Sequence, residues 1–202
     1  MIDLYIIHLK KNTDRLKLIK KNFNMFNLHI INAIKHSDGW KGCLASHQKC
    51  IKLAQQKNLE YIIVLEDDCI PTIHFNENIY KIIKYLEQNK DSWDIFLGGV
   101  TYSWVYTNLI KIEKNLNLIK INKGKTTHFM IYNKSSYNFF LNSNIDTPID
   151  KCWWNKLNVY TCIPFIAKQH NGYSDIENQN VDYNSRYDNI ENHFKKKINL
   201  LC

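Results

Sequence analysis

Three adjacent acids, Glu66, Asp67 and Asp68, directly follow a strongly apolar run over residues 61–65. In open α/β sheets, ligands bind beyond the carboxyl ends of the strands. Three neighbouring carboxylates repel one another, and Mg²⁺ or Mn²⁺ offsets that repulsion because both ions prefer carboxylate oxygens. Since alternate residues of an extended segment point the same way, Glu66 and Asp68 can share one ion while Asp67 faces elsewhere. The same acids also suit caps and turns that lead into the next segment.

A cation at this position has a role in several reactions of phosphates. It stabilises the negative charge that builds up on a nucleotide diphosphate as a sugar departs, and it also serves metal-dependent nucleases. A phosphatase of the haloacid dehalogenase type needs a nucleophilic Asp followed at fixed spacing by Asp and Thr, which Cys69 and Ile70 do not supply. The acids therefore leave glycosyl transfer and nucleic acid cleavage open.

The segments around the acids alternate between strand-like and helix-like patterns. Continuous apolar runs, typical of strands covered on both faces, occupy residues 4–9, 28–31, 61–65 and 93–97. Helical spacing of apolar residues predicts helices that begin near Asn12 and Thr13, at Gly42, and over 79–86. The alternation predicts an α/β fold with a central, mostly parallel sheet flanked by helices.

The second half of the chain is less regular. Residues 109–112 and 116–121 predict a hairpin, 127–131 a strand and 135–141 a short helix. With 202 residues and only 6 Gly and 3 Pro, the chain predicts a single domain over 1–202 without linkers. Residues 177–202 are predicted to form a polar C-terminal tail or lid.

The net charge is +8, with 27 Lys and Arg against 19 Asp and Glu. A basic surface attracts nucleic acid, anionic lipid or a nucleotide-linked substrate. The basic residues are spread along the chain, however, and heavy use of Lys, Asn and Ile is what an AT-rich genome produces. We therefore expect no nucleic acid partner, while a basic nucleic-acid-binding protein or nuclease stays the alternative.

The N-terminal segment and the cysteines bear on the expected location. Residues 1–7 lack the features of a signal peptide, and no apolar run reaches the roughly 18 residues of a membrane span. The six cysteines form no C-x-x-C pair and no zinc spacing. A soluble, cytoplasmic protein without a transmembrane segment is expected.

Four blocks of the sequence resemble glycosyltransferase family 25, which contains lipopolysaccharide-biosynthesis and collagen hydroxylysine galactosyltransferases. The blocks are Asp14-Arg15, residues 42–47, residues 64–68 and residues 169–176, in matching order. The resemblance spans residues 1 to 176 and implies a GT-A (Rossmann-like) fold, a UDP-sugar donor and inversion at the anomeric carbon. His8 and the segment before Gly42 depart from the family pattern, which concerns the acceptor side more than the donor site.

The resemblance also implies roles for individual residues. Glu66 and Asp68 resemble the metal-binding pair, and His170 is the third ligand it suggests; an imidazole beside carboxylates favours Mn²⁺ over Mg²⁺. By itself, a His before Asn-Gly is more often a turn residue. The predicted donor-binding residues are Asp14, Arg15, Lys41, Ser46 and Asp67. His47 is expected to be a core histidine bonded to backbone that keeps the donor loop in shape.

An inverting transfer needs a base that takes the proton of the acceptor hydroxyl. Asp150 resembles the family's Pro-x-Asp position and is the predicted catalytic base, with Asp94 and Asp175 as alternatives. Asp150 equally suits the first turn of a helix. Aromatic residues that could stack on sugar rings, or simply fill the core, are Tyr102, Trp104, Trp153 and Trp154.

Together these features predict a metal-dependent glycosyltransferase that moves a hexose, glucose or galactose, from a UDP-sugar to a hydroxyl acceptor on a glycan or protein. Mn²⁺ or Mg²⁺ is the expected cofactor. Besides the nucleic-acid alternative, the sequence also fits a catalytically inactive relative that binds sugar nucleotides.

Overall fold

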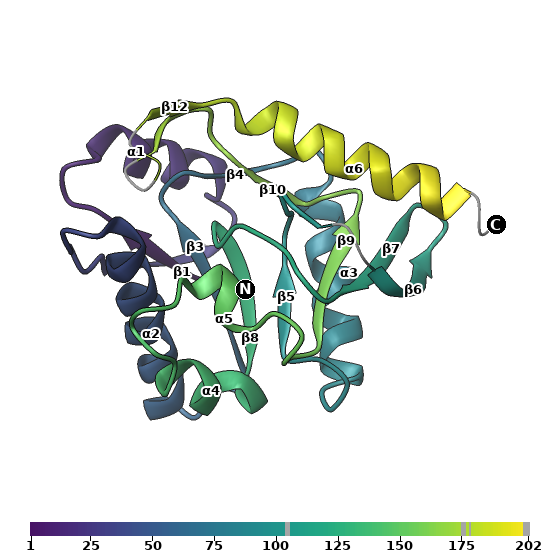
Figure 1. Cartoon of the computed structure of the whole chain (residues 1–202), viewed down its shortest axis with the longest axis horizontal. Helices are drawn as coiled ribbons and strands as arrows, with labels where there is room; N and C mark the ends of the chain where they lie inside the picture. The colour runs from purple at the N-terminus through teal and green to yellow at the C-terminus, as the bar shows by residue number, and fades with distance from the viewer. Residues whose placement is uncertain (104–105, 175–176, 178, 200–202) are drawn as a thin grey trace.

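The computed structural model describes residues 1–103, 106–174, 177 and 179–199 (Figure 1). Its centre is an eight-stranded sheet in the order β2-β1-β3-β8-β5-β9-β7-β6. These strands are β1 (Asp3–His8), β2 (Asn27–Asn32), β3 (Tyr61–Glu66), β5 (Ile95–Leu97), β6 (Tyr106–Glu113), β7 (Leu116–Ile121), β8 (Phe129–Asn133) and β9 (Val159–Ile163).

Most strands of this sheet run in one direction. The pairs β1–β2, β1–β3 and β5–β9 are parallel, whereas β8 is antiparallel to β3 and β5, and β7 is antiparallel to β9 and β6. Within the described residues, therefore, only β8 and β7 of the eight strands oppose the rest. The predicted α/β fold with a mostly parallel central sheet flanked by helices is confirmed, and so is the predicted hairpin, which is β6–β7.

Helices cover both faces of the sheet. They are α1 (Thr13–Asn22), α2 (Gly39–Gln56), α3 (Phe75–Gln88), α4 (Tyr137–Leu141), α5 (Ile149–Cys152) and α6 (Tyr183–Asn199). Apolar residues of α1 and α3 share one core with alternate strand residues such as Ile6 and Leu65. Residues of α2, α4, α5 and α6 share the other core with Ile7 and Val64. Burial on both faces explains why the inner strands are continuously apolar.

Two pairs of short strands lie beside the main sheet. They are β4 (Cys69–Pro71) with β10 (Ala167–Gln169), and β11 (Gly172–Ser174) with β12 (Gln179–Val181), each pair antiparallel. Because β10 pairs with β4, the segment that follows it returns to the acids at the end of β3. No helix within the described residues is long and apolar enough to cross a membrane.

The C-terminal region is not a polar tail. Its described residues form β12 and α6, and α6 runs along the upper edge of the molecule in Figure 1. Tyr187 and Phe194 on α6 are fully buried. Apolar residues at helical spacing within this polar sequence give α6 one buried stripe, which is all that a surface helix needs.

Replacing Phe194 by Ala is expected to destabilise the protein by about 3–5 kcal/mol, because it removes a fully buried ring that packs against Phe165. Lys196→Ala, at an exposed position of the same helix, is the control and should change stability by less than about 0.5 kcal/mol. Urea unfolding of both variants checks this. Equal midpoints would show that α6 contributes nothing to the core.

The buried side chain of His128 makes the stability of the folded protein depend on pH. Its ring is fully buried, Nδ1 lies 2.9 Å from the hydroxyl of Tyr187 on α6, and burial lowers its pKa to about 4. Between the ordinary pKa of about 6.5 and pH 4, the unfolded chain binds a proton that the folded chain does not. We expect stability to fall by about 3 kcal/mol across that window as pH falls. Urea unfolding at several pH values should show this loss, and His128→Asn should flatten it.

Candidate active site

The three acids at the end of β3 point in different directions. Asp67 is buried and faces β1: its Oδ2 accepts the backbone N–H of Leu9 at 3.1 Å and lies 2.9 Å from Nδ1 of His8. Its Oδ1 accepts from the guanidinium of Arg15 at 3.3 Å. Asp67 thus joins the end of β1 to the first turn of α1. The pleat argument from the sequence therefore does not hold here: residues 67 and 68 form a turn, and Nη1 of Arg15 lies 3.3 Å from Asp67 and 3.8 Å from Asp68.

Among the three acids, Asp68 is the one with a buried carboxylate oxygen that lacks a hydrogen-bond donor among the described residues. Its Oδ2 accepts a 3.3 Å hydrogen bond from Gln169, while its Oδ1 is buried and has no hydrogen-bond partner among the described residues. Burial and the nearby Glu66 carboxylate raise the pKa of Asp68 to about 7, against the opposing charge of Arg15 3.8 Å away. A buried carboxylate oxygen without a donor is a suitable ligand for a hard divalent cation, so the site fits the metal that the sequence predicts.

Glu66 faces α2 instead. Its Oε1 lies 3.3 Å from Nε2 of His47 and 3.6 Å from Sγ of Cys43, and it accepts from the hydroxyl of Thr127. Burial raises the pKa of Glu66, but the hydrogen bonds from His47 and Thr127 outweigh it and hold that pKa below its ordinary value. His47 is therefore not bonded to backbone as expected; it contacts the side chains of Glu66 and Tyr132.

The C-terminal block reaches the acids through the backbone. The N–H of His170 donates to the carbonyl of Asp68 at 2.8 Å, and Arg15 donates to the carbonyl of Tyr173 at 2.9 Å. Three blocks that are far apart in the sequence therefore meet at the end of β3. The imidazole of His170 is exposed beside Asp68, and its role as a ligand stays a prediction.

The other predicted donor residues lie around this centre in different environments. The carboxylate of Asp14 is 94% exposed and pairs with Lys17. Ser46 is buried: it accepts from the N–H of Ile34 at 2.8 Å and donates to the carbonyl of Gly42 at 2.7 Å. Its hydroxyl thus holds the loop before α2, and donor contact through Asp14 or Ser46 stays a prediction.

Gly42 explains how that loop can pass so close to α2. The helix begins at Gly39 rather than at Gly42, which sits in its first turn. A Cβ atom at position 42 would lie 2.6 Å from the carbonyl oxygen of Ile34, closer than real Cβ contacts. Glycine is therefore required for the loop to cross the helix here.

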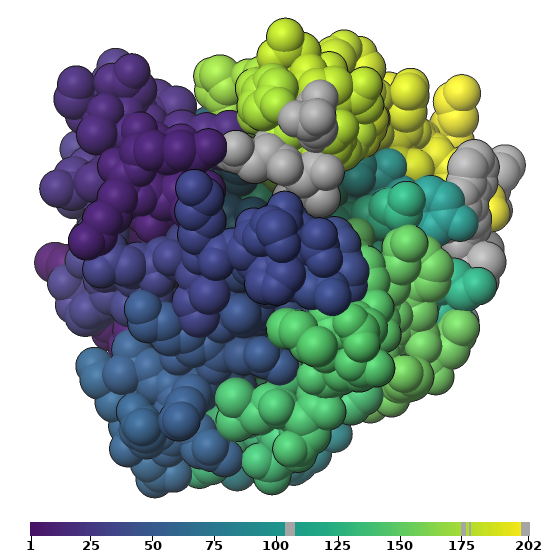
Figure 2. All heavy atoms as spheres, turned by 60° about the vertical axis from the view of Figure 1, so that its left-hand side comes forward, coloured from purple at the N-terminus to yellow at the C-terminus, as the bar shows by residue number. Residues whose placement is uncertain are grey.

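Lys41 extends from the N-terminal turn of α2 to the segment before α5. Its Nζ lies 3.0 Å from Asp146 and 3.5 Å from Asp38, and the hydrogen bond to Asp146 raises its pKa. Figure 2 shows the blue segment at the start of α2 against the green segment that contains Asp146. Lys41 is therefore a bridge on the surface beside the predicted donor site.

Asp150 lies in the first turn of α5 and is partly buried. Burial raises its pKa, against the opposing charges of Lys125 and Lys151, and the negative charge of Glu66 raises it further. Such a carboxylate is a suitable proton acceptor.

Asp94 stands at the other end of the sheet, before β5, where it accepts hydrogen bonds from the hydroxyl of Ser135 and the N–H of Asn158. The alternative base Asp94 is therefore at the opposite end of the sheet from Glu66 and Asp68, and Asp175 lies outside the described residues.

The aromatic residues that were predicted as possible sugar-stacking groups also lie in different environments. Trp153 is buried in the core, whereas Tyr102 and Trp154 stack with their ring centroids 6.1 Å apart. Trp154 donates its indole N–H to the carbonyl of Gly124. Trp104 lies outside the described residues. Among the described candidates, Tyr102 and Trp154 are therefore the half-buried pair, and the ammonium groups of Lys125 and Lys123 lie over their rings.

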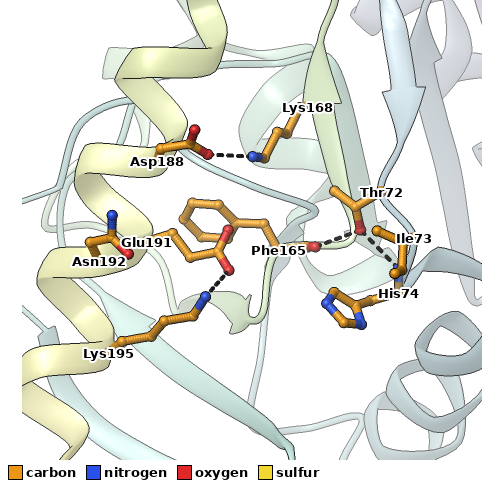
Figure 3. Close-up of a pocket in the computed structure, with 9 residues that line it drawn as sticks. All are labelled: Thr72, Ile73, His74, Phe165, Lys168, Asp188, Glu191, Asn192 and Lys195. Atoms are coloured by element: carbon orange, nitrogen blue, oxygen red, sulfur yellow. Dashed lines mark hydrogen bonds and ion pairs between the residues drawn. The ribbon is translucent and has the colours of Figure 1, made fainter.

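A cavity of about 270 Å³ between α6 and the β4–α3 connection contains none of the predicted site residues (Figure 3). Its charged side chains are paired with one another: Lys168 with Asp188 at 2.6 Å, and Lys195 with Glu191 at 2.8 Å. Because these charges are satisfied, the cavity does not replace the end of β3 as the candidate site.

The fold and the site define an α/β protein with acids at the carboxyl end of a central strand. The chain belongs to glycosyltransferase family 25 (LPS biosynthesis protein), whose family model matches residues 35–147. This confirms the predicted family, and the matched region contains the blocks at 42–47 and 64–68. No curated protein matches the chain.

Solved structures resemble this chain at low sequence identity. A197 from STIV is 13% identical with a TM-score of 0.50, covering 90% of this chain and 93% of that one. A glycosyltransferase involved in glycosylation of the major capsid of PBCV-1 is 11% identical with a TM-score of 0.44, covering 69% of this chain and 63% of that one. The mannose-1-phosphate geranyltransferase from Thermus thermophilus is 9% identical with a TM-score of 0.45, covering 79% of this chain and 72% of that one.

Sequence reasoning missed Cys43, Thr127 and Gln169, all of which contact the acids. The spacing of Cys43 and His47, four residues apart on one helix, was the available signal for the first. Gln169 is the first residue of the block at 169–176, which was the available signal for it, whereas no local pattern marks Thr127.

Proposed function

We propose that the chain is a metal-dependent glycosyltransferase that moves a hexose, glucose or galactose, from a UDP-sugar to a hydroxyl group of a glycan or protein, with inversion. The observation that carries the proposal is the buried, unpartnered Oδ1 of Asp68 at the end of the central strand, with the pKa of Asp68 raised to about 7. Membership of a glycosyltransferase family supports the same reaction class.

In this proposal, Asp68 and His170 hold Mn²⁺ or Mg²⁺. The backbone N–H of His170 donates to the carbonyl of Asp68, so the two residues are neighbours at the end of β3. Glu66 was predicted to form the metal-binding pair with Asp68, but its Oε1 is directed towards α2. When bound, the cation stabilises the negative charge on the departing diphosphate.

The donor is oriented by the basic residues around this centre. Arg15, which already contacts Asp67 and lies 3.8 Å from Asp68, presents a guanidinium group suited to a phosphate. Lys41 stands at the N-terminal turn of α2, where free N–H groups also favour an anion. Asp67 and Ser46 act by holding the loops after β1 and before α2 in place. Asp14, on the first turn of α1, completes the proposed donor-binding set.

Asp150 supplies the base. Its carboxylate takes the proton of the acceptor hydroxyl while that oxygen forms a bond to the anomeric carbon. The bond from the anomeric carbon to the diphosphate oxygen breaks on the opposite face, which inverts the configuration, and UDP leaves with the bonding electron pair. The stacked rings of Tyr102 and Trp154 are the proposed platform for the acceptor sugar.

Release of UDP from UDP-glucose and UDP-galactose, with Mn²⁺, Mg²⁺ or a chelator, tests the proposal. The expected result is release that depends on metal and increases with an added acceptor mixture of oligosaccharides. UDP binding without turnover for any donor would identify an inactive relative. Salt-sensitive binding of DNA or RNA without UDP binding would favour the nucleic-acid alternative instead.

A further inference from the structure

We propose that Cys43, His47 and Glu66 form a second cation site, selective for Zn²⁺, that joins α2 to the end of β3. The ligand atoms of these three residues all lie within 4.8 Å of one another. His47 is fully buried and Glu66 is partly buried. This site is distinct from the cation site proposed at Asp68, and the argument for it does not depend on the proposed function.

The distances match a tetrahedral zinc ion. With Zn–N, Zn–O and Zn–S bonds of about 2.0, 2.0 and 2.3 Å, tetrahedral angles place N and O about 3.3 Å apart, and S and O about 3.5 Å apart. In the structure, Nε2 of His47 lies 3.3 Å and Sγ of Cys43 lies 3.6 Å from Oε1 of Glu66. Two of the three ligand–ligand distances therefore match the edges of a tetrahedron, and the three atoms can occupy three of its corners, with water at the fourth.

The helix brings two of the ligands together. Cys43 and His47 are four residues apart in α2, so their side chains lie on the same face, which is turned towards the sheet. Glu66 reaches them from the last position of β3. Thiolate and imidazole ligands favour Zn²⁺ over the Mg²⁺ and Mn²⁺ that oxygen ligands select. The donor set thus separates this site chemically from Asp68.

The outer contacts of the cluster favour a metal-binding imidazole. The hydroxyl of Tyr132 donates to Sδ of Met130 at 3.0 Å and lies 2.8 Å from Nδ1 of His47. When this hydroxyl accepts the Nδ1–H of His47, Nε2 carries a lone pair that a cation can bind. In the other tautomer Nε2–H donates to Oε1 of Glu66, and a bound cation takes the place of that proton. Zinc ligands are commonly oriented by such a second hydrogen bond.

Binding replaces the thiol proton of Cys43, so zinc uptake releases one proton to the solvent. The ion then holds α2 against β3 and fixes the strand end that presents Asp68. Thr127, which donates to Glu66, keeps that carboxylate in place.

The first experiment uses the full chain after chelator treatment and titrates it with Co²⁺, which substitutes for Zn²⁺ and absorbs light. The expected result is one equivalent of bound cobalt with a thiolate-to-cobalt charge-transfer band that Zn²⁺ abolishes. Zn²⁺ should also raise the Tm and protect Cys43 from alkylation, as followed by mass spectrometry of the wild-type chain. Unprotected Cys43 and a cobalt spectrum without a thiolate band would overturn the proposal in favour of a hydrogen-bond network alone.

Variants then assign the ligands. Cys43→Ala should weaken zinc binding by at least about tenfold and remove the charge-transfer band. Cys50→Ala is the matched control, because Cys50 is a buried free thiol on the same helix outside the cluster, and it should bind zinc like the wild type. Tyr132→Phe should weaken zinc binding by about 10- to 100-fold while retaining the band. Equal zinc affinity in Cys43→Ala and Cys50→Ala would contradict the assignment.

The variant Asp68→Asn distinguishes the proposed zinc site from the proposed cation site at Asp68. This variant should bind zinc normally while losing Mn²⁺-dependent UDP binding. If zinc binding fails in the wild type but Mn²⁺-dependent UDP binding is present, the second site is wrong and the proposed function stands. The opposite pattern would retain the zinc site and reject the donor cation.

Discussion

Asp150→Asn is expected to lower the rate of sugar transfer by about 100- to 10,000-fold, because the amide cannot accept the proton of the acceptor hydroxyl. UDP binding should stay near the wild-type level, since Asp150 is assigned to the acceptor side. Steady-state kinetics with saturating donor, together with calorimetry of UDP binding, measure the two effects separately.

The pH profile gives an independent readout of this base. Burial raises the pKa of Asp150, and the wild-type rate must fall as pH drops through that raised pKa, because only the carboxylate accepts a proton. The control is Asp91→Asn, an exposed turn position, which should leave both the rate and its pH profile unchanged. A full rate in Asp150→Asn would move the base to another residue, with Asp175 the next candidate.

Asp68→Asn is expected to reduce metal-stimulated UDP release by about 100- to 1,000-fold, in the range seen when one preorganised group that stabilises transition-state charge is removed. The loss follows because the amide cannot replace the carboxylate as a ligand of the cation that neutralises the leaving group. The measurement is UDP release as a function of Mn²⁺ concentration. Asp188→Asn, at an exposed position of α6, is the matched control.

The same substitution should increase the stability of the metal-free protein. Because the pKa of Asp68 is raised to about 7 in the folded state, the folded chain binds a proton that the unfolded chain has lost between about pH 4 and 7. The ionised carboxylate therefore destabilises the fold at higher pH, and Asn removes that penalty. Loss of activity together with a higher Tm at pH 8 would identify Asp68 as a functional residue; unchanged activity would reject its role.

The amino-acid sequence was sufficient for the parts that depend on local pattern. Continuous apolar runs predicted the buried strands β1, β3 and β5, because strands covered on both faces have no polar side. The acids after residues 61–65 predicted a candidate site at the end of β3, since polar groups at the end of a buried strand face the ligand edge of the sheet.

Only the tertiary structure decided which side chains meet. Insertion of the antiparallel β8 between β3 and β5 brings Thr127 to Glu66, and pairing of β10 with β4 brings His170 to Asp68. Local periodicity records which face of a segment is buried, but not which segment covers it. For the same reason α6 was mistaken for a tail: its buried stripe becomes visible only when it packs against Phe165 and His128.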